Sequence, residues 1–266
     1  MNRILLAICL CLCMAPKTFA ADFATEVMDG TFKFFHKDST STCFLVRRPE
    51  PDTAVYLVTT AHTLERTHGE TAVLVLREAK SDGSYGRHDF TIAIRKSDKP
   101  LWTRHEKMDV AVLKIADPLP VPVAALPVAA LADSTALKAS GAQLCRSLFV
   151  LTYPQRFEAN DAGLPVARHG IFASPPQLPI AKHPTFLADY TTFAGDSGGP
   201  VFVETADHRP LVVGLAIAQT HHVDRMKSEY EERVIRYPLG IGTVLHAQFI
   251  REVIEIIAQQ TEPVAK

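Results

Sequence analysis

The chain has 266 residues, of which 47% are hydrophobic, and its formal net charge is −1 at pH 7. This apolar content is enough for a substantial core, and the length fits one domain or two tightly packed halves. The near-neutral charge and the absence of a long basic run disfavour nucleic acids and acidic surfaces as partners.

The N-terminus has the pattern of a secretory signal peptide over residues 1–20. Arg3 supplies a positive charge, residues 4–15 are continuously apolar, and Thr18 and Ala20 are small residues placed before a cleavage site. A transmembrane helix needs roughly 20 apolar residues, so an uncleaved anchor is the weaker interpretation. The sequence therefore predicts a mature protein that begins at Ala21, is secreted or periplasmic, and does not insert stably into a membrane.

After this segment, residues 23–36 predict a short amphipathic lead-in helix. Short apolar runs follow, several alternating with polar residues and separated by turn sequences, as half-buried strands do. These predicted strands cover residues 42–47, 54–60, 72–77, 90–95 and 110–115. Four prolines between residues 117 and 131 forbid a helix there and predict an extended crossover.

A second set of apolar runs predicts further strands beyond the crossover. They cover residues 143–151, 166–173, 185–192, 200–203, 211–218 and 240–246. Residues 247–257 differ, because their apolar side chains recur at helical spacing. We therefore expect an N-terminal half (21–130), and a C-terminal half (131–266) that ends in a helix. Cys43 and Cys145, which remain after signal removal, should be free, largely buried thiols in separate halves.

The segment Gly195-Asp196-Ser197-Gly198-Gly199-Pro200 carries the strongest chemical signal. A serine hydroxyl is a poor nucleophile, so it needs a base and preorganised donors for the developing oxyanion. Flanking glycines allow backbone dihedrals that aim several N–H groups at one point beside the serine. The alternative interpretation is a Gly/Pro-rich surface turn.

Two further segments supply a candidate base and a candidate carboxylate. His62 follows the strand run Tyr56-Leu57-Val58-Thr59-Thr60-Ala61, so it lies at a sheet edge that solvent and substrate can reach. Asp109 opens the apolar run Val110-Ala111-Val112-Leu113, so its carboxylate is partly buried and needs a hydrogen-bonding partner. Taken singly, each could be an ordinary surface histidine or strand-edge aspartate.

Together the three segments resemble the trypsin/chymotrypsin-like serine peptidase family, in its bacterial trypsin-like style. Thr-Ala-His, Asp-Val-Ala-Val-Leu and Gly-Asp-Ser-Gly-Gly-Pro stand in that family's order, whereas subtilisin-like and α/β-hydrolase enzymes use other orders. The resemblance covers roughly residues 42–258. It implies an all-β fold of two packed antiparallel six-stranded β-barrels with a C-terminal α-helix, and a protein or peptide substrate cleaved without a cofactor or metal.

The resemblance also implies a role for each residue. His62 would take the proton of Ser197 and return it to the leaving amine, while Asp109 would orient His62 and stabilise its cation. The backbone N–H groups of Gly195 and Ser197 would form the oxyanion hole. In activated digestive members a freed Ile-Val-Gly-Gly terminus pairs with the aspartate before the serine, here Asp196. That tetrapeptide is absent from this sequence, so either another group pairs with Asp196 or its carboxylate is partly exposed.

Substrate selectivity is predicted from the residues expected around the P1 side chain. Thr191 stands at the expected pocket base, where a carboxylate would select Arg or Lys, and Ile217, Ala218 and Gln219 should form the wall. We therefore expect a small or apolar P1 residue. Residues 219–236 predict a long solvated polar loop, and a metal site at its His221-His222-x-Asp224 segment is the weaker interpretation.

These features favour an exported serine endopeptidase. A catalytically latent trypsin-fold binding module is an alternative, because fold alone does not fix activity. An esterase-like hydrolase using the same triad is another. The complete triad argues against the first alternative, whereas the sequence does not separate peptide from ester hydrolysis.

Overall fold

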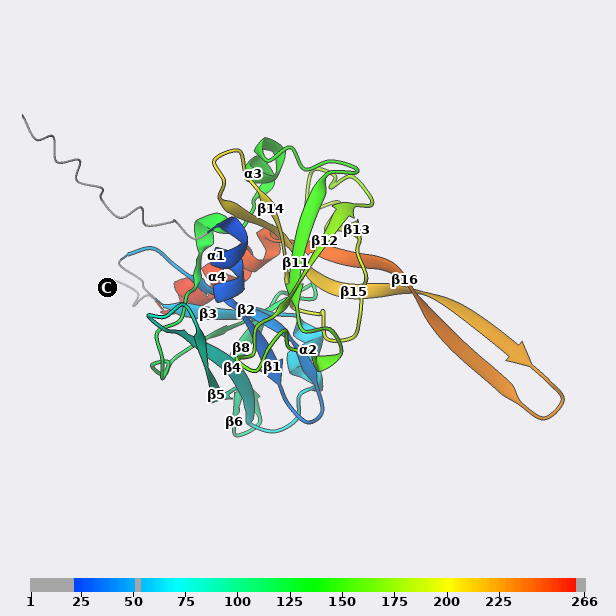
Figure 1. Ribbon diagram of the computed structural model, residues 1–266, viewed down its shortest axis with the longest axis horizontal. Coiled ribbons are helices and arrows are strands. Elements are labelled where there is room, and N and C mark those ends of the chain that lie inside the picture. The colour runs from blue at the N-terminus through cyan, green and yellow to red at the C-terminus, as the bar shows by residue number, and fades with distance from the viewer. Residues whose placement is uncertain (1–21, 51–53, 262–266) are drawn as a thin grey trace, which may run out of the picture.

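The computed structural model describes residues 22–50 and 54–261 (Figure 1). The predicted signal peptide and the cleavage site before Ala21 lie outside these residues. Within the described ranges, no helix is long and apolar enough to cross a membrane.

The N-terminal half is built on one mainly antiparallel sheet of eight strands, in the order β5-β4-β1-β2-β3-β9-β8, with β10 paired to β2 in parallel. Helix α1 (Phe23–Asp29) precedes the sheet, and α2 (Ala61–Arg66) follows β3 directly. The sheet strands are β1 (Thr31–Phe35), β2 (Thr40–Arg47), β3 (Val55–Thr59), β4 (Thr71–Ala79), β5 (Tyr85–Ala93), β8 (Trp102–Arg104), β9 (Ala111–Lys114) and β10 (Leu126–Pro127). A separate two-stranded sheet joins β6 (Arg95–Lys96) to β7 (Lys99–Pro100).

The C-terminal half contains a closed barrel in the order β11-β12-β13-β16-β15-β14. Its strands are β11 (Ser147–Thr152), β12 (Val166–Phe172), β13 (Thr185–Asp189), β14 (Pro200–Glu204), β15 (Pro210–Lys227) and β16 (Glu232–His246). The crossover from the first half carries a 3₁₀ turn η1 (Val128–Ala130) and helix α3 (Ser134–Ala139), and η2 (Pro154–Arg156) follows β11. The last helix is α4 (Gln248–Thr261).

The expected all-β fold with a C-terminal helix is confirmed, and the second half forms the expected closed six-stranded barrel. The first sheet has eight strands rather than the six that the resemblance implied. The apolar runs missed β1, where a helix was expected, and the short strands β8 and β10. The helix expected over residues 23–36 ends at Asp29. After Gly30, Phe32 and Phe34 alternate with Lys33, which is the period of strand β1.

Two further expectations need correction. The polar loop expected over residues 219–236 forms the outer parts of β15 and β16, joined as a two-stranded ribbon. Strands exposed on both faces can carry polar residues throughout, so hydrophobic alternation gave no signal there. Cys43 and Cys145 are both free as expected, but Cys145 is exposed.

Both faces of the first sheet are buried, and one of them packs against the C-terminal half. Leu45, Leu57 and Leu74 fill the interior of the first half. The side chains of Phe44 and Val58 belong to a second cluster that continues into the barrel and α4. This second cluster includes Val112, Val150, Val212, Ile250 and Val253. The halves are therefore held together by close-packed apolar contact.

Arg77 adds a buried polar connection between the halves. Its side chain lies on β4 and donates to Tyr153 Oη and the Gly163 carbonyl of the second half, both at 3.0 Å. It also donates to the carbonyls of Met28 and Thr31 at 2.6 and 2.7 Å. One buried guanidinium thus fixes the end of α1 and the loop after β11 to the first sheet.

His246, the last residue of β16, is a buried histidine whose ring nitrogens have no hydrogen-bond partner within the described residues. Its ring lies 5.1 Å from that of Phe186. Burial lowers the pKa of His246 to about 4, from an ordinary value near 6.5. The folded state therefore holds the neutral ring, while the unfolded state gains a proton as the pH falls.

We predict that this difference makes the fold acid-sensitive. The stability contribution is present above about pH 6.5 and is lost as the pH falls toward about 4, by on the order of 3 kcal/mol. Urea unfolding of wild type and His246→Leu at pH 7.5 and 4.5 measures it. The variant should lose less stability between the two pH values than wild type, whereas exposed His183→Leu should behave like wild type. Equal pH dependence in all three proteins would contradict the prediction.

Candidate active site

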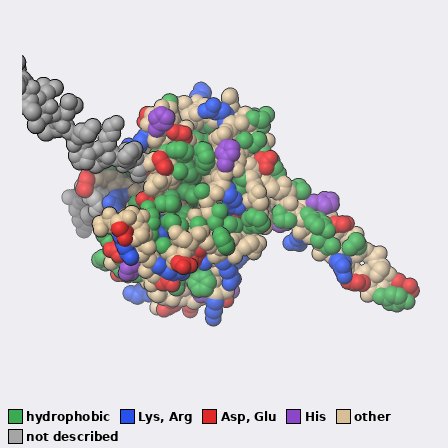
Figure 2. All heavy atoms as spheres, viewed as in Figure 1, with side chains coloured by type: hydrophobic (Ala, Val, Ile, Leu, Met, Phe, Trp, Pro, Cys, Tyr) green, Lys and Arg blue, Asp and Glu red, His purple; other side chains and the backbone are tan. Residues whose placement is uncertain are grey.

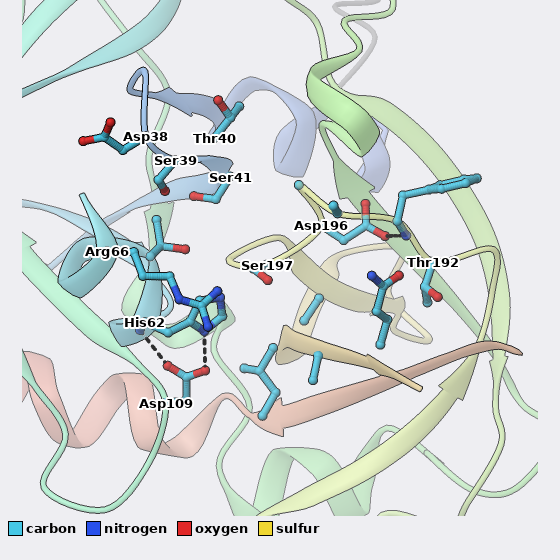
Figure 3. A pocket seen from close by; sticks show the side chains of 18 of the residues that line it. Asp38, Ser39, Thr40, Ser41, His62, Arg66, Asp109, Thr192, Asp196 and Ser197 are labelled. Carbon is cyan, nitrogen blue, oxygen red and sulfur yellow. Dashed lines mark hydrogen bonds and ion pairs between the residues drawn. The ribbon is translucent and has the colours of Figure 1, made fainter. Parts of the chain in front are cut away.

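The pairing of β3 with β9 brings His62 and Asp109 together. Thr59 and Ala111 are partners in this antiparallel pair, so the residues just after β3 and just before β9 meet at one sheet edge. His62 lies in the first turn of α2, and its Nδ1 is 2.6 Å from Asp109 Oδ2. Its backbone N–H donates to Asp109 Oδ1 at 2.9 Å. Both oxygens of one carboxylate therefore hold a single histidine (Figure 3).

The electrostatics of this pair favour a charged carboxylate. Burial raises the pKa of Asp109, but the hydrogen bonds from the His62 ring and backbone lower it further, and the pKa ends below its ordinary value. With an ionised acceptor at this distance, Nδ1 carries the ring proton, and Nε2 keeps the lone pair that a base needs.

Ser197 lies in a tight loop just before β14 that only glycines can form. Gly195 has φ 101°, and a Cβ there would collide with the Tyr153 carbonyl oxygen. Gly198 has φ 89°, and its Cβ would collide with the Thr42 carbonyl oxygen. A larger residue at position 198 would break the close approach of the loop to the first half, and one at position 195 would break its approach to the segment after β11.

Thr42, a fully buried residue of β2, attaches this loop to the first half. Its N–H donates to the Ser197 carbonyl at 3.0 Å. Its hydroxyl donates to the Gly195 carbonyl at 2.9 Å and accepts from the Tyr153 N–H at 3.0 Å. These bonds fix the peptide groups that follow Gly195 and Ser197. The peptide groups that precede them are also held, since the Ala194 carbonyl accepts from the Gln155 N–H at 2.6 Å and the Asp196 carbonyl accepts from the Gly199 N–H at 2.9 Å.

The N–H groups of Gly195 and Ser197 are unused by the protein. In the part of the sequence that the structure describes, neither donates a hydrogen bond. Two free, rigidly held backbone donors beside a serine can stabilise an oxyanion. The oxyanion-hole role of these two N–H groups stays a prediction.

His62, Asp109 and Ser197 line one cavity of about 630 Å³ between the two halves (Figure 3). Across the described residues, no hydrogen bond joins Ser197 Oγ to His62, and the partner of Nε2 is Thr60 Oγ1 at 3.5 Å. Without substrate such bonds are often long, so the shared cavity is the relevant observation.

The cavity also contains most of the residues predicted to contact a P1 side chain. Ile217, Ala218 and Gln219 line it as predicted. Thr191, predicted at its base, is exposed and does not line it. Its neighbours Tyr190 and Thr192 do line the cavity and are 4% and 2% exposed. Of the two threonines, Thr192 and not Thr191 therefore lines the cavity.

The buried carboxylate of Asp196 is paired with Arg168, a residue of β12 that sequence reasoning missed. Arg168 Nη2 lies 2.5 Å from Asp196 Oδ1, and the two side chains are 13% and 6% exposed. Thr152 Oγ1 donates to the same oxygen at 2.8 Å, and the Phe193 N–H donates to Oδ2 at 2.8 Å. The sequence left open whether Asp196 pairs with another group or is partly exposed. The structure shows that it is buried and pairs with Arg168. The guanidinium also lies over the Tyr190 ring, 5.3 Å from its centroid.

The described residues contain no group of three or more His, Cys, Asp or Glu side chains placed to hold a metal ion. His221 and His222 are neighbours on β15. Successive side chains of a strand point to opposite faces, so these two rings diverge.

Comparison with known proteins gives a family and two solved structures. Residues 41–215 match the family model described as the trypsin-like peptidase domain. A structure of Rv3671c from M. tuberculosis H37Rv, a serine-to-alanine mutant in its inactive form, is 17% identical, with a TM-score of 0.46, and the match covers 91% of this protein and 93% of that one. The Rv3671c protease in its inactive form is 18% identical, with a TM-score of 0.47, and the match covers 88% of this protein and 92% of that one. No curated protein matches this sequence.

We predict that Arg168 is essential for the stability of the loop that carries Ser197. Arg168→Met leaves the Asp196 carboxylate buried without its cation, which should lower the free energy of unfolding by about 3–5 kcal/mol. Adding Asp196→Asn should restore part of this loss. Urea unfolding followed by the fluorescence of Trp102, the single tryptophan, measures both.

The matched control for this prediction is Arg233→Met. Arg233 forms an exposed pair with Glu231 at 3.2 Å, so its loss should cost less than about 1 kcal/mol. If Arg168→Met is as mild as this control, the buried pair does not support the loop.

Proposed function

The chain belongs to the trypsin-like peptidase family and is a serine peptidase, and on this premise we propose that it is an exported endopeptidase acting through His62, Asp109 and Ser197. The observation that carries the proposal is the two-point hold of Asp109 on His62 in the cavity that contains Ser197. The signal-like pattern of residues 1–20 supports export.

The proposed reaction proceeds through an acyl-enzyme. Ser197 Oγ attacks the peptide carbonyl as its proton passes to His62 Nε2, and the carbonyl oxygen becomes an oxyanion between the N–H groups of Gly195 and Ser197. Collapse of this intermediate breaks the C–N bond, and the imidazolium returns its proton to the leaving amine. Water, deprotonated by His62, then hydrolyses the ester and regenerates the Ser197 hydroxyl. Asp109 stabilises the His62 cation in both steps.

The walls of the cavity favour an uncharged P1 side chain, small or apolar. Ala216, Ile217 and Ala218 present aliphatic surface on this side. The carboxylate of Asp196 is already neutralised by Arg168. A P1 Arg or Lys would therefore be buried without a partner, at a cost of several kcal/mol.

The first prediction of the proposal concerns the nucleophile. Ser197→Ala should fold normally yet lose hydrolysis by at least about 10⁴-fold, and a fluorophosphonate probe should label wild type at Ser197 and leave the variant unlabelled. Ser84→Ala, in an exposed turn, is the control and should keep both properties. Equal hydrolysis by Ser197→Ala and wild type would contradict the assignment.

The same assay distinguishes the alternatives when it is run on a protein substrate and on a small ester. Hydrolysis of the ester alone would identify an esterase-like hydrolase. A folded wild-type protein that hydrolyses neither substrate would be a latent binding module.

The second prediction concerns P1 selectivity and is measured with a P1-scanned fluorogenic peptide series. For wild type, kcat/KM should be higher with Ala, Val, Leu or Phe at P1 than with Arg or Lys. Thr192→Asp should raise cleavage after Arg and Lys, because a carboxylate would then face the P1 side chain. Thr191→Asp, one residue away but outside the cavity, is the matched control and should not. A wild-type preference for Arg or Lys would overturn the assignment of the pocket.

A further inference from the structure

Strands β15 and β16 continue far beyond the barrel as a two-stranded ribbon, defined here as residues 219–240 (Figure 1). The two strands pair with each other out to Lys227 and Glu232. Their barrel neighbours stop much earlier, since β14 reaches β15 only to Leu215 and β13 reaches β16 only to Ile241. In the described part of the sequence, both outer edges of the ribbon therefore lack a strand partner.

The ribbon exposes large apolar side chains along its length. The exposed residues are Val223, Met226, Tyr230, Val234, Tyr237 and Leu239. Figure 2 shows this apolar surface interspersed with charges of both signs along the projecting arm. By the antiparallel register, Met226 and Tyr237 lie on one face of the ribbon, and Val223 and Val234 lie on the other. A two-stranded hairpin is marginally stable in water, so apolar side chains exposed on both faces suit a ribbon that is covered by a partner. The mixed charges suit a polypeptide better than a nucleic acid or an anionic membrane.

The edge of β15 that leads into the ribbon begins at the catalytic loop. Gly198 N–H donates to the Ala216 carbonyl at 2.9 Å, and Ala216 N–H donates to the Gly199 carbonyl at 3.0 Å. The loop that carries Ser197 thus lies on the same edge of β15 that is open further along. The next residues, Ile217 to Gln219, line the cavity and continue directly into the ribbon.

The chemistry of the cavity tells which part of a substrate would meet the ribbon. His62 gives its proton to the leaving amine, so the substrate segment on the C-terminal side of the cut lies on the side of α2. Arg66 of α2 and Asp38 line the cavity on that side (Figure 3). The acyl portion, which is N-terminal to the cut, then lies toward Ile217–Gln219. Continued outward, this portion follows β15.

We propose that the ribbon binds the substrate segment N-terminal to the scissile bond, as an added β-strand on the outer edge of β15. This inference rests on the proposed endopeptidase function. Main-chain hydrogen bonds would supply affinity with little dependence on sequence. The edge of β15 suits this better than that of β16, where Pro238 removes a donor. With about 3.3 Å per residue, the arm of β15 can pair with about eight substrate residues.

Fluorogenic peptides that share one cleavage site and carry N-terminal extensions of about two to ten residues test the proposal. For wild type, kcat/KM should rise with extension by about 10- to 100-fold in total, and C-terminal extension should give no such rise. In a shortened variant, an Asn-Gly turn, which suits a two-residue hairpin, replaces residues 222–237. This variant should show a flat length series and hydrolyse a small ester like wild type.

A second measurement identifies strand addition and leaves the protein unchanged. Methylation of alternate backbone amides in the extension should abolish the gain for one set of amides and spare the other, because one side of a paired strand faces away from its partner. Equal sensitivity of both sets, or an equal length dependence in the shortened variant, overturns the proposal.

The proposed function and the ribbon proposal fail in different ways. If wild type hydrolyses no substrate, the proposed function falls and the ribbon proposal with it. If wild type cleaves peptides with no dependence on N-terminal length, the ribbon proposal alone falls. If sedimentation shows that shortening the ribbon converts a dimer into a monomer while the length series is retained, the ribbon joins two copies of the protein and does not bind substrate.

Discussion

Thr42 is the point where the two halves of the molecule fix the geometry of the candidate site. Its backbone and hydroxyl groups bond to both Gly195 and Ser197, and its carbonyl accepts from Thr59 Oγ1 at 2.9 Å. Thr59 ends the strand that leads to His62. One buried residue of the first sheet is therefore connected to the loop that carries Ser197 and to the strand that leads to His62. A displacement of Thr42 would therefore move the loop that carries Ser197 and the strand that leads to His62 together.

The shared core explains why such a connection can be held rigidly. The site lies between two bodies, and its residues come from both. Because the outer face of the first sheet packs directly into the barrel core and against α4, the halves cannot slide without opening close-packed apolar contacts. Arg77 adds hydrogen bonds that have strict directions. Apolar burial thus supplies the strength of the interface, and the polar contacts fix its register.

The parts of the fold and site that the sequence predicted are those where chemistry restricts the residue type. A serine nucleophile requires a base, a carboxylate and flexible glycines, and these appear as short local motifs around His62, Asp109 and Ser197. Arg168 was missed because a buried carboxylate requires a cation without specifying which one, and the protein has 28 Lys and Arg residues. The prediction placed Thr191 in the cavity, whereas its neighbour Thr192 lines it. The sequence did not show this, because strand β13 ends at Asp189 and no motif marks which of the following side chains turns inward. The ribbon was missed because strands exposed on both faces lack the alternation that identifies a half-buried strand.

The cation that pairs with Asp196 is a side chain of the folded protein itself, and this affects when activity can begin. Where the cation is a newly cut terminus, a folded precursor stays idle until another protease acts on it. Here Arg168 belongs to strand β12, so the ion pair forms when the barrel forms. On the proposed function, the pairing of Asp196 therefore needs no activating cut to create its cation. A cell that makes such a hydrolase has to restrain it by where the protein folds, by what reaches the cleft, or by how long the folded protein survives.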